Sequence, residues 1–137
     1  MAAGVDRNAG IIAEFRANAG RVGGPFEGAP LLLLTTTGAR SGRVGVKPVI
    51  YLDLDDRLYV FGSKGGAPTS PDWYYNLVAH PAASVEVGTE AYEVTATVLE
   101  GAERDRVFAE QARRYPAFAE YQAGTERTIP VVALDRR

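Results

Sequence analysis

LLLLTTTGARSGRVGVKPVIYLDL, residues 31–54, is the stretch that decides the fold. Two largely apolar runs, 31–34 and 49–54, flank a loop that is rich in glycine, threonine and arginine. Short apolar runs bounded by such loops are typical of buried strands, so we expect strands over 31–36 and 46–54. The loop between them also lies in a segment with no acidic residue, since none occurs from Gly28 to Leu52.

The rest of the chain alternates between short strands and helices. Turn residues at Asp55-Asp56 and Gly88-Thr89 predict two further hairpins, and Pro130 suits the start of a last strand. The other expected strands are 57–62, 83–87, 91–99 and 127–134; the expected helices are 6–19, one that begins at Ser70-Pro71 and ends at His80, 101–115 and a short one over 116–124.

This order predicts one α+β domain. About six mainly antiparallel strands, linked by hairpins, would curl into a small barrel with three or four helices around it. We divide the domain into an N-terminal helix with its Gly- and Pro-rich linker, residues 1–28, and the barrel itself, residues 29–137.

The composition excludes several classes of protein. A chain of 137 residues fits one domain, and a net charge of −2 argues against a general nucleic-acid binder. There is no cysteine and one histidine, His80, so Cys-ligated metals and multi-His metal sites are excluded. The sequence has neither a signal-peptide pattern nor an apolar run of the ~20 residues that a membrane span needs. We expect a cytoplasmic protein, with contact between the N-terminal helix and a membrane surface as the alternative.

Two segments have the residue types of an anion site. In residues 36–47, glycines allow close approach of backbone N–H groups, Thr and Ser add hydroxyls, and Arg40, Arg43 and Lys47 add positive charge. The segment GSKGG, residues 62–66, repeats this combination within a second acid-free span. A phosphate or carboxylate would fit both segments, and two solvated turns are the alternative.

Aromatic side chains form a second candidate feature. Tyr115, Phe118 and Tyr121 are spaced by three residues, and Trp73 begins a run of three aromatics. Aromatic residues at helical spacing belong either to the core or to a pocket for a flat ligand, and tyrosine keeps a polar tip that favours a cleft. Because the side chains supply little reactive chemistry of their own, an enzyme of this composition would depend on a bound organic cofactor.

Several motifs, in order from Pro30 to Ala133, resemble the deazaflavin-dependent nitroreductase and F420H(2)-dependent quinone reductase family. They are TTTGARSG, SKGG, PDWYYNL, YPAFAEY and RTIP. The resemblance implies a split β-barrel that holds reduced coenzyme F420 in a groove, with FMN, FAD or heme as the alternative cofactors. It also implies an actinobacterial oxidoreductase that transfers a hydride to a quinone, a nitroaromatic or a similar planar acceptor.

Residues are assigned to this groove by their positions in the motifs and in the two candidate anion segments. Arg40, Ser41 and Lys64 would face the phosphate and tail of the cofactor. The full expected cofactor-binding set is Thr37, Arg40, Ser41, Gly42, Arg43, Lys47, Pro48, Val49, Ser63, Lys64, Gly65, Gly66, Trp73 and Asn76. The expected catalytic residues are Ser63, Tyr115 and Tyr121, as hydrogen-bond donors to the acceptor, and the expected substrate pocket is Ile50, Phe118 and Tyr121.

Three positions depart from the family pattern. Gly45 stands where the family often has arginine, Ile50 where an aromatic residue is common, and Phe118 where the middle tyrosine is expected. These departures leave room for a non-catalytic protein that binds and carries F420, which is the alternative function. The partners expected of the enzyme are small planar acceptors and no nucleic acid, in a monomer or a homodimer.

Overall fold

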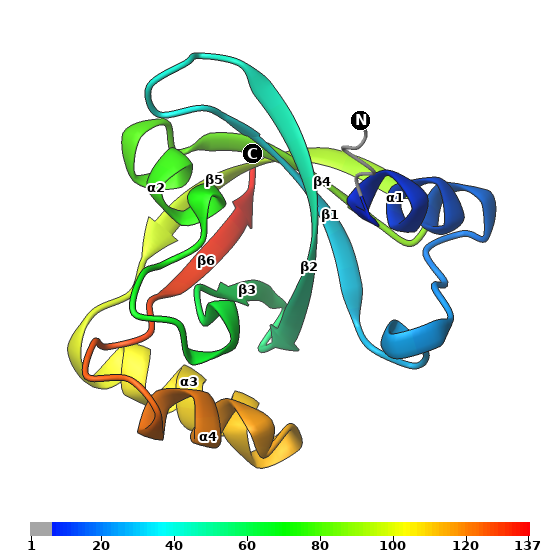
Figure 1. Cartoon of the computed structure of the whole chain (residues 1–137). Helices are drawn as coiled ribbons and strands as arrows, with labels where there is room; N and C mark the ends of the chain where they lie inside the picture. The colour runs from blue at the N-terminus through cyan, green and yellow to red at the C-terminus, as the bar shows by residue number, and fades with distance from the viewer. Residues whose placement is uncertain (1–6) are drawn as a thin grey trace.

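Six strands close into an antiparallel barrel in the computed structural model, which describes residues 7–137 (Figure 1). In chain order the elements are α1 (Arg7–Ala17), the 3₁₀ helix η1 (Gly24–Phe26), β1 (Leu31–Thr37), β2 (Val44–Leu54), β3 (Arg57–Phe61), the 3₁₀ helix η2 (Lys64–Gly66), α2 (Asp72–Ala79), β4 (Ala82–Val87), β5 (Glu90–Val98), α3 (Gly101–Arg114), α4 (Ala117–Ala123) and β6 (Val131–Arg136).

The strands follow the order β1-β2-β3-β6-β5-β4, and β4 pairs with β1 to close the barrel. The hairpin between β2 and β3 turns at Asp55 and Asp56, which both have positive φ, at 55° and 62°. Two successive positive φ angles match the twist of the flanking strands. The hairpin between β4 and β5 turns at Gly88-Thr89, as the sequence predicted.

The four leucines that begin β1 are buried on both faces of the sheet. Leu32 and Leu34 point into the barrel and join its central cluster, whereas Leu31 and Leu33 pack outside it against α1 and the linker. Side chains of a strand alternate between the two faces, so an unbroken apolar run is stable only where both faces are covered. Because α1 covers the outer face, the first four residues of β1 can all be apolar instead of alternating between apolar and polar.

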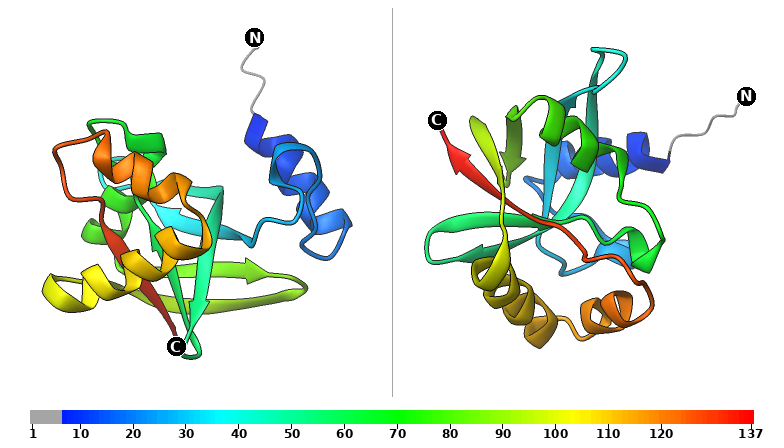
Figure 2. Two further views of the ribbon diagram at one scale, coloured as in Figure 1. Left: turned by 90° about the horizontal axis from the view of Figure 1, so that it is seen from below. Right: turned by 90° about the vertical axis from the view of Figure 1, so that its left-hand side faces the viewer.

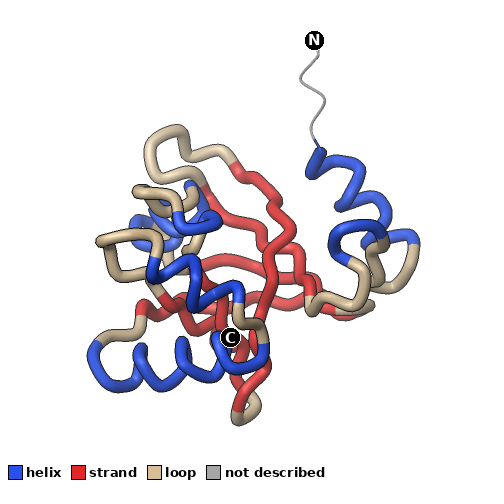
Figure 3. The backbone as a smooth tube through the Cα atoms, turned by 60° about the horizontal axis from the view of Figure 1, so that its bottom comes forward, coloured by secondary structure: helices blue, strands red, loops and turns tan. Residues whose placement is uncertain are grey.

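The same double burial recurs on the opposite side of the barrel. Val60 of β3 and Val132 of β6 point inward, while Phe61 and Val131 pack outward in a second cluster with α3 and α4. Figure 3 shows the strands between α1 on one side and the α3–α4 pair on another. On β5 polar residues alternate with apolar ones, and several of the polar residues are exposed.

Helix α1 is attached to the barrel by close backbone packing and by an ion pair. The φ of Gly20 is +91°, and a Cβ on it would lie 2.7 Å from the Cα of Gly88 in the β4–β5 hairpin. Arg16 donates two hydrogen bonds to the carboxylate of Glu86, at 3.1 and 2.8 Å. Figure 2 shows α1 lying outside the strands, away from α3 and α4.

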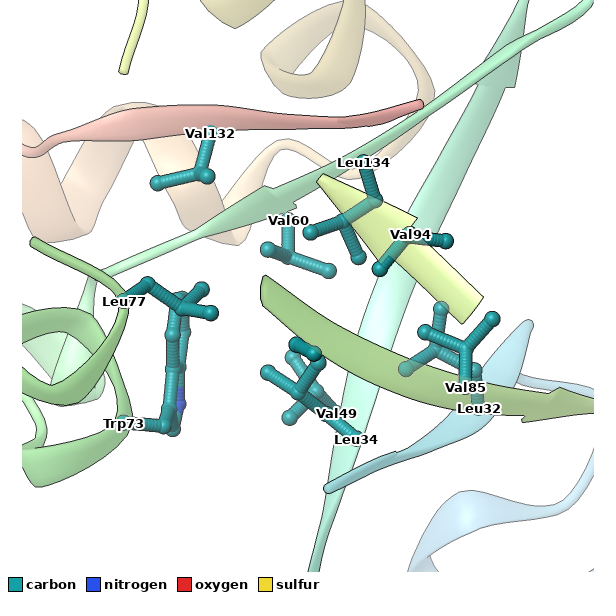
Figure 4. Close-up of a cluster of buried hydrophobic side chains, with 11 residues drawn as sticks. Leu32, Leu34, Val49, Val60, Trp73, Leu77, Val85, Val94, Val132 and Leu134 are labelled. Atoms are coloured by element: carbon teal, nitrogen blue, oxygen red, sulfur yellow. The ribbon is translucent and has the colours of Figure 1, made fainter. Parts of the chain in front are cut away.

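Helix α2 closes one mouth of the barrel. Trp73 and Leu77 extend from it toward the barrel interior, where they meet residues of several strands (Figure 4). Trp73 is 8% exposed and Leu77 2% exposed, so the helix is part of the core and not a surface attachment. Any residue on the outer side of α2 therefore has a fixed position relative to the barrel.

Most predicted element boundaries agree with the structure to within two residues. Strand β2 begins at Val44 rather than 46, and α2 begins at Asp72, with Pro71 as its N-cap. The last strand was predicted four residues too early, since β6 spans Val131–Arg136 rather than 127–134. The predicted start of the first helix at residue 6 lies outside the described residues. Among residues 7–137, no helix combines the length and hydrophobicity that crossing a bilayer requires.

The double burial of β1 predicts a large cost for truncating an inward-facing leucine. We expect Leu34→Ala, at a fully buried position, to lower the free energy of unfolding by about 2–5 kcal/mol, because lost apolar contacts and a cavity add together. Urea denaturation followed by circular dichroism measures this change. Val98→Ala is the matched control, since Val98 is 37% exposed. Equal losses in both variants would contradict the placement of Leu34 in the barrel interior.

Candidate functional site

A basic hollow lies beside the loop between β1 and β2. The loop, residues 38–43, is closed by a hydrogen bond from Gly38 N–H to Arg43 O at 2.7 Å and another from Gly42 N–H to Gly38 O at 3.0 Å. The hollow measures ≈ 670 Å³ and is lined by Gly38, Ala39, Arg40, Ser41, Arg43, Val44, Gly45, Lys47, Asp72, Tyr75 and Asn76. Its three cations outnumber its single acid, Asp72, so its charge favours an anionic ligand.

The cations of this region are not used to hold the fold together. Within residues 7–137, Arg40, Arg43, Lys47 and Lys64 form no ion pair with an acidic side chain. Elsewhere arginine is paired, as where Arg57 grips Asp135 with two hydrogen bonds of 2.8 and 2.9 Å and lowers the pKa of that carboxyl group. The unpaired cations are therefore available to a ligand.

Asn76 of α2 fixes the loop to the barrel. Its Oδ1 accepts a hydrogen bond from Ala39 N–H at 2.9 Å, and its Nδ2 donates to Thr36 Oγ1 at 3.1 Å. One side chain thus joins α2, the loop and the end of β1. Since both ends of the amide are engaged within the protein, Asn76 sets the shape of the basic hollow.

A second hollow, which we call the aromatic hollow, opens between the barrel mouth and α4. It measures ≈ 420 Å³ and is lined by Phe26, Leu31, Pro48, Val49, Ile50, Phe61, Ser63, Lys64, Gly65, Pro71, Trp73, Phe118 and Tyr121. The rings of Phe118 and Tyr121 meet edge to face, with centroids 5.3 Å apart. Apolar walls with a few polar groups are typical of a small-molecule site.

Neighbouring residues of the same two elements line the two hollows. Lys47 lines the basic hollow and the next residue, Pro48, lines the aromatic one; likewise Asp72 lines the first and Trp73 the second. Strand β2 and helix α2 therefore run along both. Together the two hollows offer apolar walls for a flat group and positive charge for an anionic one.

The turn that follows β3 has an uncommon backbone. Lys64, Gly65 and Gly66 have φ angles of 46°, 63° and 85°, which lie in the left-handed region. Only glycine adopts this region without strain, and Lys64 is the exception here. A Cβ on Gly66 would lie 3.0 Å from the carbonyl oxygen of Tyr121, so this glycine permits close packing of the turn against α4.

The structure brings most of the predicted site residues together. Arg40, Ser41, Arg43, Lys47 and Asn76 line the basic hollow; Pro48, Val49, Ile50, Ser63, Lys64, Gly65, Trp73, Phe118 and Tyr121 line the aromatic one. Lys64 therefore lines a different hollow from Arg40, although both were expected to face the phosphate and tail of the cofactor. Gly42 and Gly66 line neither hollow, and Thr37 lies in a different groove with Ser84 and Arg137. Tyr115, 37% exposed at the end of α3, also lies outside both.

Sequence reasoning missed several lining residues. Phe26 comes from the linker helix η1 and contributes an aromatic wall to the aromatic hollow. It stands alone in a Gly- and Pro-rich segment, so no local pattern marks it. Tyr75 and Asp72 of α2 line the basic hollow, and their place beside Asn76 in the PDWYYNL motif is a signal that could have identified them.

The comparisons with known proteins agree with this geometry. The model of the family described as F420H(2)-dependent quinone reductase matches residues 10–136. The F420H(2)-dependent quinone reductase Rv1261c of Mycobacterium tuberculosis is 39% identical over 130 residues, which cover 90% of this chain and 85% of that protein.

Two solved structures show the shared fold. The structure of an F420-H2 dependent reductase, FDR-A, has a TM-score of 0.71 at 39% identity and covers 77% of this chain and 94% of its own. The heme storage protein HutZ of Vibrio cholerae has a TM-score of 0.62 at 17% identity, with 96% and 91% covered, which shows likeness of fold alone. The predicted split β-barrel is confirmed. The chain belongs to the F420H(2)-dependent quinone reductase family.

Proposed function

We propose that this protein is an F420-dependent oxidoreductase that transfers a hydride from reduced F420 to a planar acceptor of the quinone type. The observation that carries the proposal is that neighbouring residues of β2 and α2 line a basic hollow and an aromatic hollow, and that most of these residues belong to the family motifs. The names of the matched family and of its relative in M. tuberculosis support the choice of cofactor and acceptor.

The residues present fit the cofactor. An anionic phosphate and carboxylate tail suits the basic hollow, where Arg40, Arg43 and Lys47 have no acidic partner within the described chain. A Cβ placed on Gly45 or Gly65 would meet no atom within 4 Å, so both positions leave open space beside the backbone. The planar ring would suit the aromatic hollow, whose apolar lining includes Pro48 and Trp73. Gly45 stands where the family often has arginine. The missing side chain leaves more space in the basic hollow, which still has three cations in its lining.

When bound, reduced F420 supplies the hydride from its deazaflavin ring. The protein contributes position, since apolar walls that include Phe26, Ile50 and Phe118 hold a flat acceptor against the cofactor and exclude water. It also contributes hydrogen bonds to the oxygen on which negative charge develops.

We infer that two hydroxyl groups, those of Ser63 and Tyr121, donate these hydrogen bonds. Ser63 is 9% exposed and Tyr121 half-buried, and both line the aromatic hollow. Within residues 7–137 neither hydroxyl makes a hydrogen bond to another group, so each can turn toward a ligand. Tyr115 remains a candidate donor by motif, but Tyr121 is the tyrosine of this pair that faces the hollow.

Lys64→Ala tests the cofactor assignment. We expect F420 to bind more weakly by about 1.5–3 kcal/mol, roughly 10- to 100-fold in Kd, because a charge-assisted contact to the cofactor is lost. Alanine also has a Cβ, so the substitution leaves the backbone strain at this left-handed position unchanged and removes only the charged side chain. Arg106→Ala is the control, since Arg106 is an exposed cation of α3 that lines neither hollow and whose ion pair to Asp55 is 3.6 Å long. An unchanged Kd in Lys64→Ala would show that Lys64 does not contact the cofactor.

Tyr121→Phe tests the donor to the acceptor. We expect kcat with menadione to fall by about 10-fold or more while the Kd for F420 stays within about twofold, because only a hydrogen bond to the developing charge is lost. Tyr92→Phe is the matched control, because Tyr92 lies on β5 and lines neither hollow. Equal losses of turnover and of cofactor affinity would place Tyr121 on the cofactor. A loss of turnover in Tyr115→Phe alone would transfer the donor role to Tyr115.

A further inference from the structure

Arg127 lines neither hollow, but it donates hydrogen bonds to segment 62–70, which forms one wall of the aromatic hollow. Its Nε donates to Ala67 O at 2.8 Å, and its Nη1 donates to Ser70 Oγ at 3.1 Å. Its Nη2 donates to two carbonyl oxygens, those of Gly62 at 3.0 Å and Ser63 at 2.9 Å. One guanidinium thus holds both ends of segment 62–70 from a position about sixty residues further along the chain.

The segment needs such a restraint because its turn is strained. Lys64 holds a φ of 46°, which a residue with a Cβ keeps only where the surroundings impose it. The turn has two hydrogen bonds of its own, from Gly66 N–H to Ser63 O and from Ala67 N–H to Lys64 O. Arg127 donates to the same carbonyl oxygen of Ser63 and to that of Ala67. The carbonyl of Ser63 therefore accepts both from within the turn and from Arg127. Fixing that peptide also fixes where the side chains of Ser63 and Lys64 point.

Arg127 is itself held by a network from the two C-terminal helices. Gln122 of α4 donates from Nε2 to Arg127 O at 2.8 Å, and its Oε1 accepts from Ile129 N–H at 3.0 Å. Arg104 of α3 donates to the same Oε1 at 2.8 Å and to Ile129 O at 2.7 Å. The backbone around Arg127 is thus fixed to α3 and α4, which pack on the outside of β3 and β6.

We propose that Arg127 is a positioning residue for the cofactor site: it holds segment 62–70 so that Ser63 and Lys64 face the aromatic hollow. The role of the hollow in binding F420 rests on the function proposed above. Arg127 itself does not line the hollow, so it acts through the turn and not by touching a ligand.

The geometry requires arginine at this position. Four acceptors are spread around one side chain, and the planar guanidinium presents donors from three nitrogen atoms toward them at once. Lysine has the charge but only one nitrogen atom at the end of a flexible chain, so it cannot reach both ends of the segment together. A lysine at position 127 would keep the positive charge but lack the planar guanidinium group, so we expect it not to hold the turn in place.

The test is Arg127→Lys in the full-length protein. Hydrogen–deuterium exchange is followed by mass spectrometry for peptides that cover 62–70 and, for comparison, strand β2. We expect exchange in 62–70 to accelerate by about 10-fold or more, while β2 keeps the wild-type rate. The Kd for F420, measured by quenching of Trp73 fluorescence, should rise by about 10-fold. Arg113→Lys is the matched control, because Arg113 is exposed and pairs with Glu110 of its own helix.

The outcomes separate the alternatives. Unchanged exchange in 62–70 would overturn the proposal, as would accelerated exchange throughout the barrel together with a lower Tm, since that pattern indicates a general loss of stability. Ser70→Ala, which removes one acceptor and leaves Arg127 in place, should give a smaller, equally local acceleration, and it serves if Arg127→Lys does not fold. Failure of the wild-type protein to bind F420 would contradict the proposed function, and the exchange comparison alone would then decide whether Arg127 holds the segment.

Discussion

The burial of β1 on both faces is the constraint on which the rest of the structure depends. Leu32 and Leu34 fill the barrel, and Leu31 and Leu33 require a cover outside it, which α1 and its linker provide. This arrangement fixes the direction of the strand and therefore the place where the glycine-rich loop leaves it. The same cover brings Phe26 to the aromatic hollow, so the packing that stabilises the fold also completes the site.

The site is built where flexible segments meet rigid ones. The β1–β2 loop is clamped by Asn76, and segment 62–70 is clamped by Arg127; in both cases a polar side chain from a distant element bonds to the backbone of a glycine-containing turn. The cations of these two segments, Arg40, Arg43 and Lys64, form no ion pair with an acidic residue of the described chain. Charge is thereby held ready for an anionic ligand on a preformed surface, which reduces the ordering that binding would otherwise require.

Local patterns were sufficient to predict the strands, because continuous apolar runs and turn pairs such as Asp55-Asp56 depend on near neighbours. They also marked the two glycine-rich segments as candidate binding segments, and residues of both segments line the hollows. They could not separate Tyr115 from Tyr121. Tyr115 is the C-cap of α3, with a φ of −133°, and Pro116 is the N-cap of α4, so the three-residue spacing does not continue along one helix. Phe26 and Arg127 escaped prediction because their partners lie far away in the sequence.

The most direct measurement is a titration of the purified protein with F420, with FMN, FAD and NADPH in parallel, followed through the fluorescence of Trp73, the sole tryptophan, which lines the aromatic hollow. Reduced F420 is then mixed with menadione and its oxidation is recorded. We predict saturable quenching by F420 at lower concentrations than by the other three cofactors, and rapid oxidation in the presence of the protein. Quenching by FMN, FAD or NADPH alone, or tight binding of F420 without oxidation by menadione, would contradict the assignment of this chain as an F420-dependent quinone reductase.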